Sequence, residues 1–189
     1  MSAHAQPNVS PGDYLAWERR QETRHEYVNG EIHAMTGASR KHNLINGNIA
    51  ANLHARMRDM PCEVYSNDMR VKVNATGLYT YPNIVAACGE PQFEDAEVDT
   101  LLNPLLIVEV LSASTEAYDR GAKFLHYRKL PSLREYVRVA QTEYRVEHYL
   151  RQAENHWLLT ELSGLDETLS LVSVGCALPL RELYERVDL

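Results

Sequence analysis

The chain has 189 residues, of which 44% are hydrophobic and 24% are charged, and its formal net charge at pH 7 is −7. This composition is typical of one globular domain and excludes a collagen-like or intrinsically disordered chain. The negative balance disfavours nonspecific nucleic-acid binding over the whole surface, although it is compatible with a local basic groove.

The N-terminus and the cysteines bear on the compartment. The sequence MSAHAQPNVSPG has neither the basic start nor the apolar segment of a secretory signal. No apolar run is long enough for a membrane span. We therefore expect a flexible tail over residues 1–9 and a single cytoplasmic domain over residues 10–189. Cys62, Cys88 and Cys176 are odd in number and widely spaced, so we expect them to be buried, reduced thiols.

The first predicted elements are a helix, a hairpin and a longer helix. The sequence SPGD is typical of a helix start and predicts a short helix to about Arg20. The Asn29-Gly30 pair between alternating segments predicts a β-hairpin whose returning strand opens at Glu31. Over residues 39–59, apolar side chains recur at three- or four-residue intervals, which predicts an amphipathic helix.

The middle of the chain changes to a strand pattern. Three β-rich segments are expected over residues 63–65, 69–73 and 79–88. The acidic sequence FEDAEVDTLLNP then predicts a solvent-exposed loop. Leu105–Leu111 reads as a strand buried on both faces. Residues 112–115 offer an N-cap for a helix that continues to about Lys129.

The remaining sequence is rich in predicted strands. One is expected over Glu135–Val139, and two more in YRVEHYLRQAENHWLLTEL. LSLVSVGCALPLRELYERV predicts a further strand and a short closing helix. The order of helices and strands indicates a single α/β domain.

Glu109 is unusual because it interrupts an otherwise apolar strand between two valines. Burying an ionised carboxylate is costly unless it is paired, hydrogen-bonded or bound to a metal. One explanation is an ion pair with Lys123 or Arg120 from the following helix. The other is a cation site, which needs more than one oxygen ligand.

Other oxygen-bearing residues occur near predicted strand ends, namely Glu31, Asp68 and Asn83. Glu31 and Asp68 could also be solvated turn residues, and Asn83 could cap a turn after Pro82. Lys123 could stabilise the negative charge that develops when water attacks a phosphodiester, or could orient or help deprotonate that water. It could equally be a helix-surface lysine without a role in a site.

Several motifs carry a resemblance to a known family. They are NGEI, SRKHNLINGNIAANL, SNDMRVKV, YTYPNIVAACG and LLIVEVLSASTEAYDRGAKFLHYRKLPSLREYV. Together they resemble the Uma-type restriction endonuclease family of the PD-(D/E)XK nuclease-like superfamily, over roughly Tyr14 to Tyr184. The resemblance implies a restriction-endonuclease-like fold, in which helices flank a mixed central β-sheet that follows an N-terminal helix and hairpin. It also implies a magnesium-dependent nuclease site at one edge.

The resemblance also suggests roles for individual residues. Glu109 stands in the glutamate position of the second motif, but the lysine expected two residues later is replaced by Leu111. Lys123 of DRGAKF matches a lysine that has moved to the following helix. Glu31 matches an acidic residue contributed by an earlier element. His42, Asp68 and Asp119 lie in family-like motifs without an assigned role.

The chain departs from the family pattern at Asn83, where aspartate is expected after Pro82. An amide oxygen can coordinate a cation but brings no negative charge, so the affinity for Mg²⁺ should fall. We predict a homodimeric endonuclease that cleaves DNA with Mg²⁺, or with Mn²⁺ in its place, held by Glu31, Asn83 and Glu109. The alternatives are an inactive nuclease-fold protein that binds nucleic acid or a protein partner, and a scaffold in which Glu109 and Lys123 form an ion pair.

Overall fold

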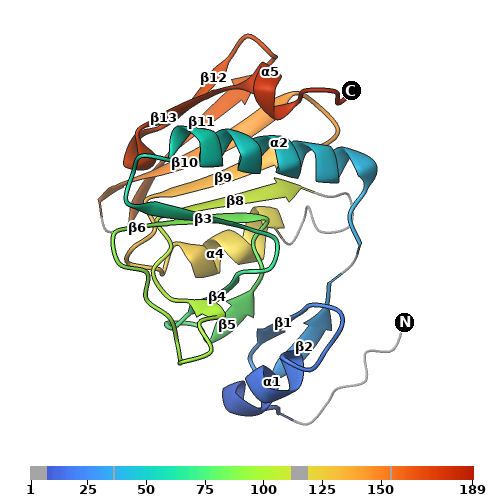
Figure 1. Ribbon diagram of the computed structural model, residues 1–189, viewed down its shortest axis with the longest axis vertical. Helices are drawn as coiled ribbons and strands as arrows, with labels where there is room; N and C mark the ends of the chain where they lie inside the picture. Colours follow the sequence, from blue (N-terminus) through green and yellow to red (C-terminus); the bar gives the residue numbers. More distant parts are fainter. Residues whose placement is uncertain (1–7, 36, 112–118, 154) are drawn as a thin grey trace.

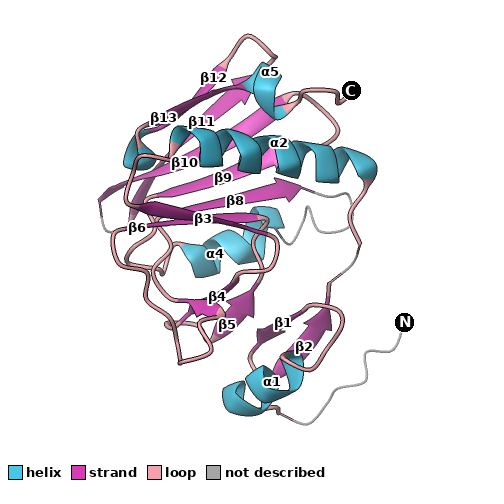
Figure 2. Ribbon diagram, in the orientation of Figure 1, coloured by secondary structure: helices cyan, strands magenta, loops and turns pink. Residues whose placement is uncertain are grey.

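The computed structural model describes residues 8–35, 37–111, 119–153 and 155–189. Figure 1 shows a large mixed β-sheet crossed by the long helix α2, with a smaller sheet towards the N-terminal end of the molecule. Figure 2 separates helices from strands in the same view. The architecture confirms the predicted α/β fold with a mixed central sheet flanked by helices.

The large sheet has six strands in the order β11-β10-β9-β8-β6-β3, and only the central pair β8 and β9 is parallel. The smaller sheet has five strands in the order β2-β1-β5-β4-β7. The strands of the large sheet are β3 (Cys62–Ser66), β6 (Ile84–Cys88), β8 (Leu106–Leu111), β9 (Glu135–Ala140), β10 (Arg145–Ala153) and β11 (His156–Ser163). Those of the smaller sheet are β1 (His25–Val28), β2 (Glu31–Ala34), β4 (Arg70–Val73), β5 (Leu78–Thr80) and β7 (Thr100–Leu101).

The other elements are helices and one separate hairpin. The hairpin consists of β12 (Thr168–Leu171) and β13 (Cys176–Pro179). The helices are α1 (Pro11–Glu18), α2 (Arg40–Arg56), the π-helix η1 (Asp119–Lys123), α4 (Phe124–Tyr127), the 3₁₀-helix η2 (Val172–Val174) and α5 (Leu180–Leu183). Among the described residues, no helix is long and apolar enough to cross a membrane.

Two apolar clusters cover opposite faces of the large sheet. On one face, Ile45, Ile49 and Leu53 of α2 belong to the same cluster as Val108 and Val110 of β8. Their spacing in α2 is the helical period predicted from the sequence. This face of the sheet is therefore filled by a hydrophobic core.

The second cluster lies between the two sheets. Ile107 of β8 and Tyr136 of β9 pack there with Tyr127 of α4 and Val71 of β4. Side chains alternate along a strand, so Glu109 points to the same side as Ile107. The unusual carboxylate is thus directed towards α4 and the smaller sheet.

The predicted hairpin is present as β1 and β2, with Val28 opposite Glu31. Both residues of the Asn29-Gly30 turn have positive φ, 52° and 89°, as a two-residue turn of this kind requires. Tyr27 of β1 pairs with Tyr79 of β5, which attaches the hairpin to the rest of the smaller sheet. The turn residues Asn29-Gly30 therefore predicted this hairpin correctly.

The single strand predicted over residues 79–88 is wrong. The structure divides the segment into β5 and β6, which belong to different sheets. Pro82 has no backbone N–H with which to continue a ladder, so the chain leaves one sheet and enters the other at this point. Asn83 therefore lies at the crossover between the two sheets.

Other boundaries differ more modestly. The predicted acidic loop contains β7, and Asp95 and Asp99 of this segment each lie 2.8 Å from Arg19. The C-terminal segment holds two strands rather than one before its closing helix. The helix expected from Thr115 begins outside the described residues, and its described part is the π-helix η1 followed by α4.

The expectation of three reduced cysteines is wrong for two of them. Cys62 and Cys88 are opposite each other on β3 and β6 and form a disulfide. Cys176 is a buried free thiol, as predicted. The pair is 26 residues apart in sequence, and only the antiparallel register brings the two side chains together.

Candidate active site

The carboxylate of Glu109 lies in a buried charge cluster. Lys123 Nζ is 3.3 Å from Glu109 Oε1 and 3.0 Å from Oε1 of Glu26, which belongs to β1. Glu109 and Lys123 are 3% and 6% exposed, so water screens their interaction weakly. The ion pair considered from the sequence is present, and a second carboxylate joins it.

The helix after β8 directs two functional side chains towards this cluster. Lys123 is the last residue of η1, and Tyr127 follows it by four residues at the end of α4. Residues four apart in a helix lie on the same side, and both of these side chains contact Glu109. A π-helical turn is uncommon and frequently marks a functional site.

Hydroxyl groups complete the contacts of the two carboxylates. The Tyr127 hydroxyl donates to Glu109 Oε1 at 2.8 Å, and the Thr80 hydroxyl donates to Glu26 Oε1. The two hydroxyl oxygens are 3.5 Å apart. Burial and the adjacent charge of Glu109 raise the pKa of Tyr127, so its phenol remains a hydrogen-bond donor.

Asn83 joins the cluster from the sheet crossover. Its backbone nitrogen is 3.4 Å from Glu109 Oε2, and its Oδ1 accepts from the backbone N–H of Val110 at 2.8 Å. A backbone N–H can only donate, so this bond fixes the orientation of the amide. Asn83 Nδ2 then faces His42 Nε2 at 3.3 Å.

The start of α2 lies against this crossover. The Ser39 side chain caps the helix by accepting from the backbone N–H of His42 at 3.1 Å. One turn later, Asn46 Nδ2 donates to Asn67 Oδ1 at 2.8 Å, and Asn67 N donates to Asn83 O at 2.8 Å. In the sequence, His42 lies in a family-like motif but has no assigned role. The structure places its side chain next to that of Asn83.

Arg138 lies beside Glu109 on the neighbouring strand. The two residues are partners in the parallel register of β8 and β9. Arg138 is 4% exposed, hydrogen-bonds Glu147 of β10, and lies 4.8 Å from the ring centroid of Tyr149. The charge of Arg138 is therefore offset by a buried carboxylate on the next strand.

Glu31 does not occupy the position predicted for it. Its carboxylate is 3.5 Å from His33, and its side chain is 66% exposed. The structure instead has Glu26 of the preceding strand beside Lys123. Glu26 shares a face of β1 with Val28, which packs against the second apolar cluster, but alternation along the strand does not by itself say which face turns inward.

The remaining residues of the family-like motifs are placed as follows. Asp68 is exposed and lies 3.3 Å from Arg24. The backbone of Asp119 and Arg120 belongs to η1, but their side chains lie outside what the structure describes. Of the predicted site residues, the structure thus brings together Asn83, Glu109 and Lys123.

The donor atoms of the cluster are suited to a hard cation. Glu26 and Glu109 offer carboxylate oxygens and Asn83 offers an amide oxygen, whereas softer metals favour thiolate and imidazole ligands. Mg²⁺ is commonly bound through one or two carboxylates, with waters and phosphate oxygens completing its coordination. The part of the chain that the structure describes has no group of three or more His, Cys, Asp or Glu that could hold a metal ion. The fit to Mg²⁺ thus rests on the type of donor atom, namely two carboxylates and one amide oxygen.

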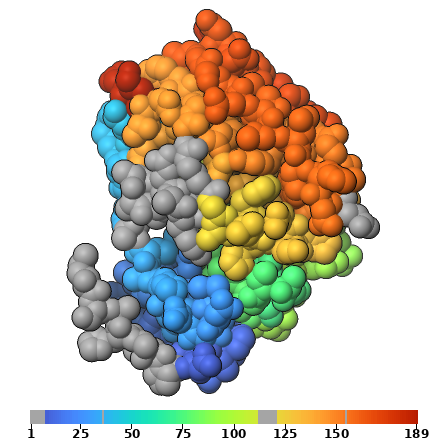
Figure 3. All heavy atoms as spheres, turned by 180° about the vertical axis from the view of Figure 1, so that it is seen from behind, coloured from blue at the N-terminus to red at the C-terminus, as the bar shows by residue number. Residues whose placement is uncertain are grey.

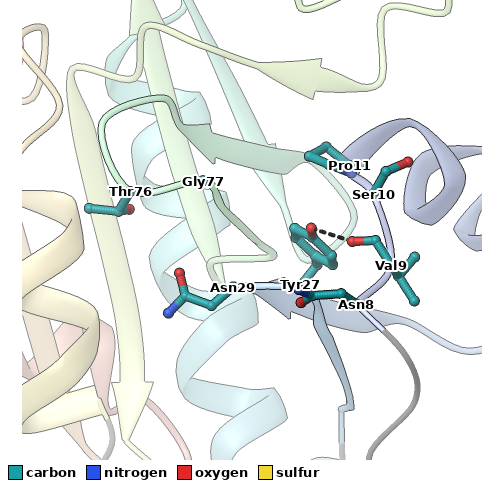
Figure 4. A pocket seen from close by; sticks show the side chains of 9 residues that line it. Asn8, Val9, Ser10, Pro11, Tyr27, Asn29, Thr76 and Gly77 are labelled. Atoms are coloured by element: carbon teal, nitrogen blue, oxygen red, sulfur yellow. Dashed lines mark hydrogen bonds between the residues drawn. The ribbon is translucent and has the colours of Figure 1, made fainter.

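A pocket of about 380 Å³ lies away from this cluster, between the N-terminal segment and two turns (Figure 4). Its described lining includes Tyr27, Asn29 and Thr76, and none of the described lining residues is charged. The Tyr27 hydroxyl donates to Val9 O at 2.7 Å across it. Val9, the last residue of the expected tail, is thereby held against the hairpin. The pocket lacks the ionisable groups of the buried cluster.

Comparison with known proteins identifies the family. The model of the Uma2 family, described as “Putative restriction endonuclease”, matches residues 11–181. Two uncharacterized proteins of Synechocystis sp. are similar in sequence. One is 34% identical over 94% of this chain and 92% of its own length, and the other is 37% identical over 82% and 88%.

A solved structure supports the fold independently of close sequence similarity. It is described as a “putative nuclease belonging to DUF820” from Anabaena variabilis. It superposes with a TM-score of 0.77 over 95% of this chain and 99% of its own, at 15% sequence identity. Sequence and fold thus agree, and the chain belongs to the Uma2 family.

Proposed function

We propose that this chain is a Mg²⁺-dependent endonuclease that hydrolyses phosphodiester bonds in DNA. The observation that carries the proposal is the buried cluster in which Lys123 lies between Glu109 and Glu26. A lysine beside carboxylates, on the sheet face opposite the α2 core, is the combination that phosphodiester hydrolysis needs. Membership in a family described as “Putative restriction endonuclease” supports the same reaction.

Glu109 and Glu26 would hold the metal, with the amide oxygen of Asn83 as a third ligand. When bound, Mg²⁺ would polarise a phosphoryl oxygen and lower the pKa of a coordinated water. Lys123 would stabilise the negative charge that builds on the transferring phosphorus group. Because two carboxylates surround its ammonium group, we assign Lys123 to charge stabilisation rather than to deprotonation of the water.

Asn83→Asp tests the proposal by adding the charge that the family pattern contains. One oxygen of the aspartate would keep the bond from Val110 N–H, while the other would replace the amide nitrogen that now faces His42. We expect Mn²⁺ affinity to rise by about tenfold, or ~1.4 kcal/mol, and plasmid cleavage to increase. Calorimetry and a plasmid assay at neutral pH measure the two effects.

Two further variants make this test specific. Asn43→Asp adds the same charge on the exposed side of α2 and should change neither property. Glu109→Ala should abolish both metal binding and cleavage. If neither the unchanged chain nor Asn83→Asp binds Mg²⁺ or Mn²⁺ or cuts DNA, the nuclease proposal is wrong.

Asn83 also favours a second candidate function, an inactive nuclease-fold protein that binds nucleic acid or a protein partner. Its amide oxygen accepts a backbone hydrogen bond within the structure, and it contributes no charge to a cation. Binding to DNA without cleavage, weakening steeply with salt, would support this alternative. Binding insensitive to salt would instead indicate a protein partner.

We also propose that the enzyme acts as a homodimer, because paired nuclease sites can meet both strands of a duplex. Light scattering that gives a monomer would contradict this. A cytoplasmic location remains our proposal as well. The disulfide between Cys62 and Cys88 argues against this location, because disulfides are rare in a reducing cytoplasm. Cell fractionation, with the chain detected by antibody, tests it.

A further inference from the structure

Tyr127 has no role in the proposed reaction so far, although it is completely buried beside the charge cluster. Its hydroxyl donates to Oε1 of Glu109 at 2.8 Å. With 0% exposure it cannot contact DNA. Any effect of Tyr127 on hydrolysis must therefore be indirect, and Glu109 is the carboxylate to which its hydroxyl donates.

The two oxygens of Glu109 receive different donors. Oε1 accepts from Tyr127 and lies 3.3 Å from Lys123, both on the helical side, whereas Oε2 faces the backbone N–H of Asn83 at the sheet crossover. A carboxylate held from two sides cannot rotate about its last side-chain bond without losing hydrogen bonds. Its orientation is therefore set before a cation arrives, which is the preorganisation that a metal site requires.

Thr80 provides a corresponding contact for the other carboxylate. Its hydroxyl donates to Glu26 Oε1, it is 0% exposed, and its oxygen is 3.5 Å from that of Tyr127. The two hydroxyls therefore lie side by side, and each contacts one of the carboxylates that flank Lys123. Glu26 and Glu109 come from different sheets, so this pair of hydroxyls joins the two halves of the site.

We infer that Tyr127 is a positioning residue that orients Glu109 for metal binding, with Thr80 acting in the same way on Glu26. This inference rests on the proposed function. Loss of an outer hydrogen bond to a metal ligand typically weakens metal affinity or activity by 10–100-fold. Tyr127→Phe should therefore reduce Mn²⁺ affinity by about 10–100-fold and lower kcat, while KM for DNA stays unchanged.

A matched control separates positioning from general damage. Tyr184 is 3% exposed, and its hydroxyl is 2.9 Å from Ala140 O, within the core on the α2 side. Tyr184→Phe removes an equally buried hydroxyl and should leave Mn²⁺ affinity and kcat unchanged. Thr80→Val, which keeps the side-chain shape, should weaken Mn²⁺ binding as Tyr127→Phe does.

The experiment measures Mn²⁺ binding by calorimetry and steady-state cleavage for the unchanged chain and each single variant. Thermal unfolding without metal is measured for Tyr127→Phe, Glu109→Gln and the double variant. Unchanged Mn²⁺ affinity in Tyr127→Phe, or an equal loss in Tyr184→Phe, would overturn the inference. If the unchanged chain neither binds metal nor cleaves DNA, the proposed function fails, and the predicted effects of Tyr127 on Mn²⁺ affinity and on the cleavage rate fail with it. The unfolding data still test the hydrogen bond between Tyr127 and Glu109. If the Tm shift of the double variant equals the sum of the two single shifts, the two residues are not coupled and the inference is overturned, whereas a non-additive shift supports the coupling.

Discussion

Replacement of Lys123 by methionine gives the most direct test of the buried cluster. The change keeps much of the side-chain length but removes the ammonium group that lies 3.0 Å from Glu26 and 3.3 Å from Glu109. The three side chains are only 4–12% exposed, so solvent compensates little for the loss. Removing one partner of a buried ion pair typically costs about 3–5 kcal/mol.

That cost predicts a lower unfolding temperature in the absence of metal. At about 2–4 °C per kcal/mol for a chain of this size, Tm should fall by roughly 6–20 °C in EDTA. Differential scanning calorimetry at pH 7 measures the shift. Lys129→Met is the matched control, because Lys129 is exposed shortly after the same helix and should contribute little.

Magnesium should reverse part of this loss. With Lys123 replaced, a divalent cation is left as the counter-charge for the two carboxylates, and a concentration of 100 times Kd stabilises by ~2.7 kcal/mol. A Lys123→Met variant as stable as the unchanged chain would refute the ion-pair reasoning. A full loss of stability without any Mg²⁺ effect on either chain would instead favour the scaffold, in which removing all three charges together should restore stability.

Two further predictions concern features outside the cluster. Burial alone would raise the pKa of Glu135, but hydrogen bonds from His148, Ser173 and Val172 N lower it below its usual 4.5. The ionised carboxylate therefore stabilises the fold above pH 4.5, and this stabilisation is lost as the pH falls further. Glu135→Gln should cost about 1.5–3 kcal/mol near pH 7 and should make stability, followed by circular dichroism, depend less on pH in the acid range. An unchanged pH dependence in the acid range would contradict this. For the disulfide between Cys62 and Cys88, thiol titration of the unfolded chain without reductant should find one reactive thiol, and three would contradict it. Reduction should destabilise by ~3.5 kcal/mol for a 26-residue loop.

Local signals in the sequence predicted much of the fold. The hairpin follows from the turn residues Asn29-Gly30. Helix α2 follows from the helical spacing of its apolar side chains, which pack in the core. The division of residues 79–88 between two sheets is not local information. Pro82 signalled a break, but a continuous apolar run concealed which sheet each half would join.

The candidate site was predictable in the same measure. Glu109 could be identified because a carboxylate in an apolar strand needs a partner, and Lys123 follows it by 14 residues. Glu26 could not be preferred over Glu31 without knowing which face of the hairpin meets Thr80. No sequence period predicts the π-helical turn that ends at Lys123.

The N-terminal hairpin has a consequence for how the site is assembled. Seen from behind in Figure 3, the blue N-terminal part of the chain lies beside the green segments. Glu26 comes from β1 of this part, and with it Lys123 and Glu109 form a group with one net negative charge. Without the hairpin the same group would be a neutral pair, so the strand that carries Glu26 supplies the net negative charge that attracts a cation.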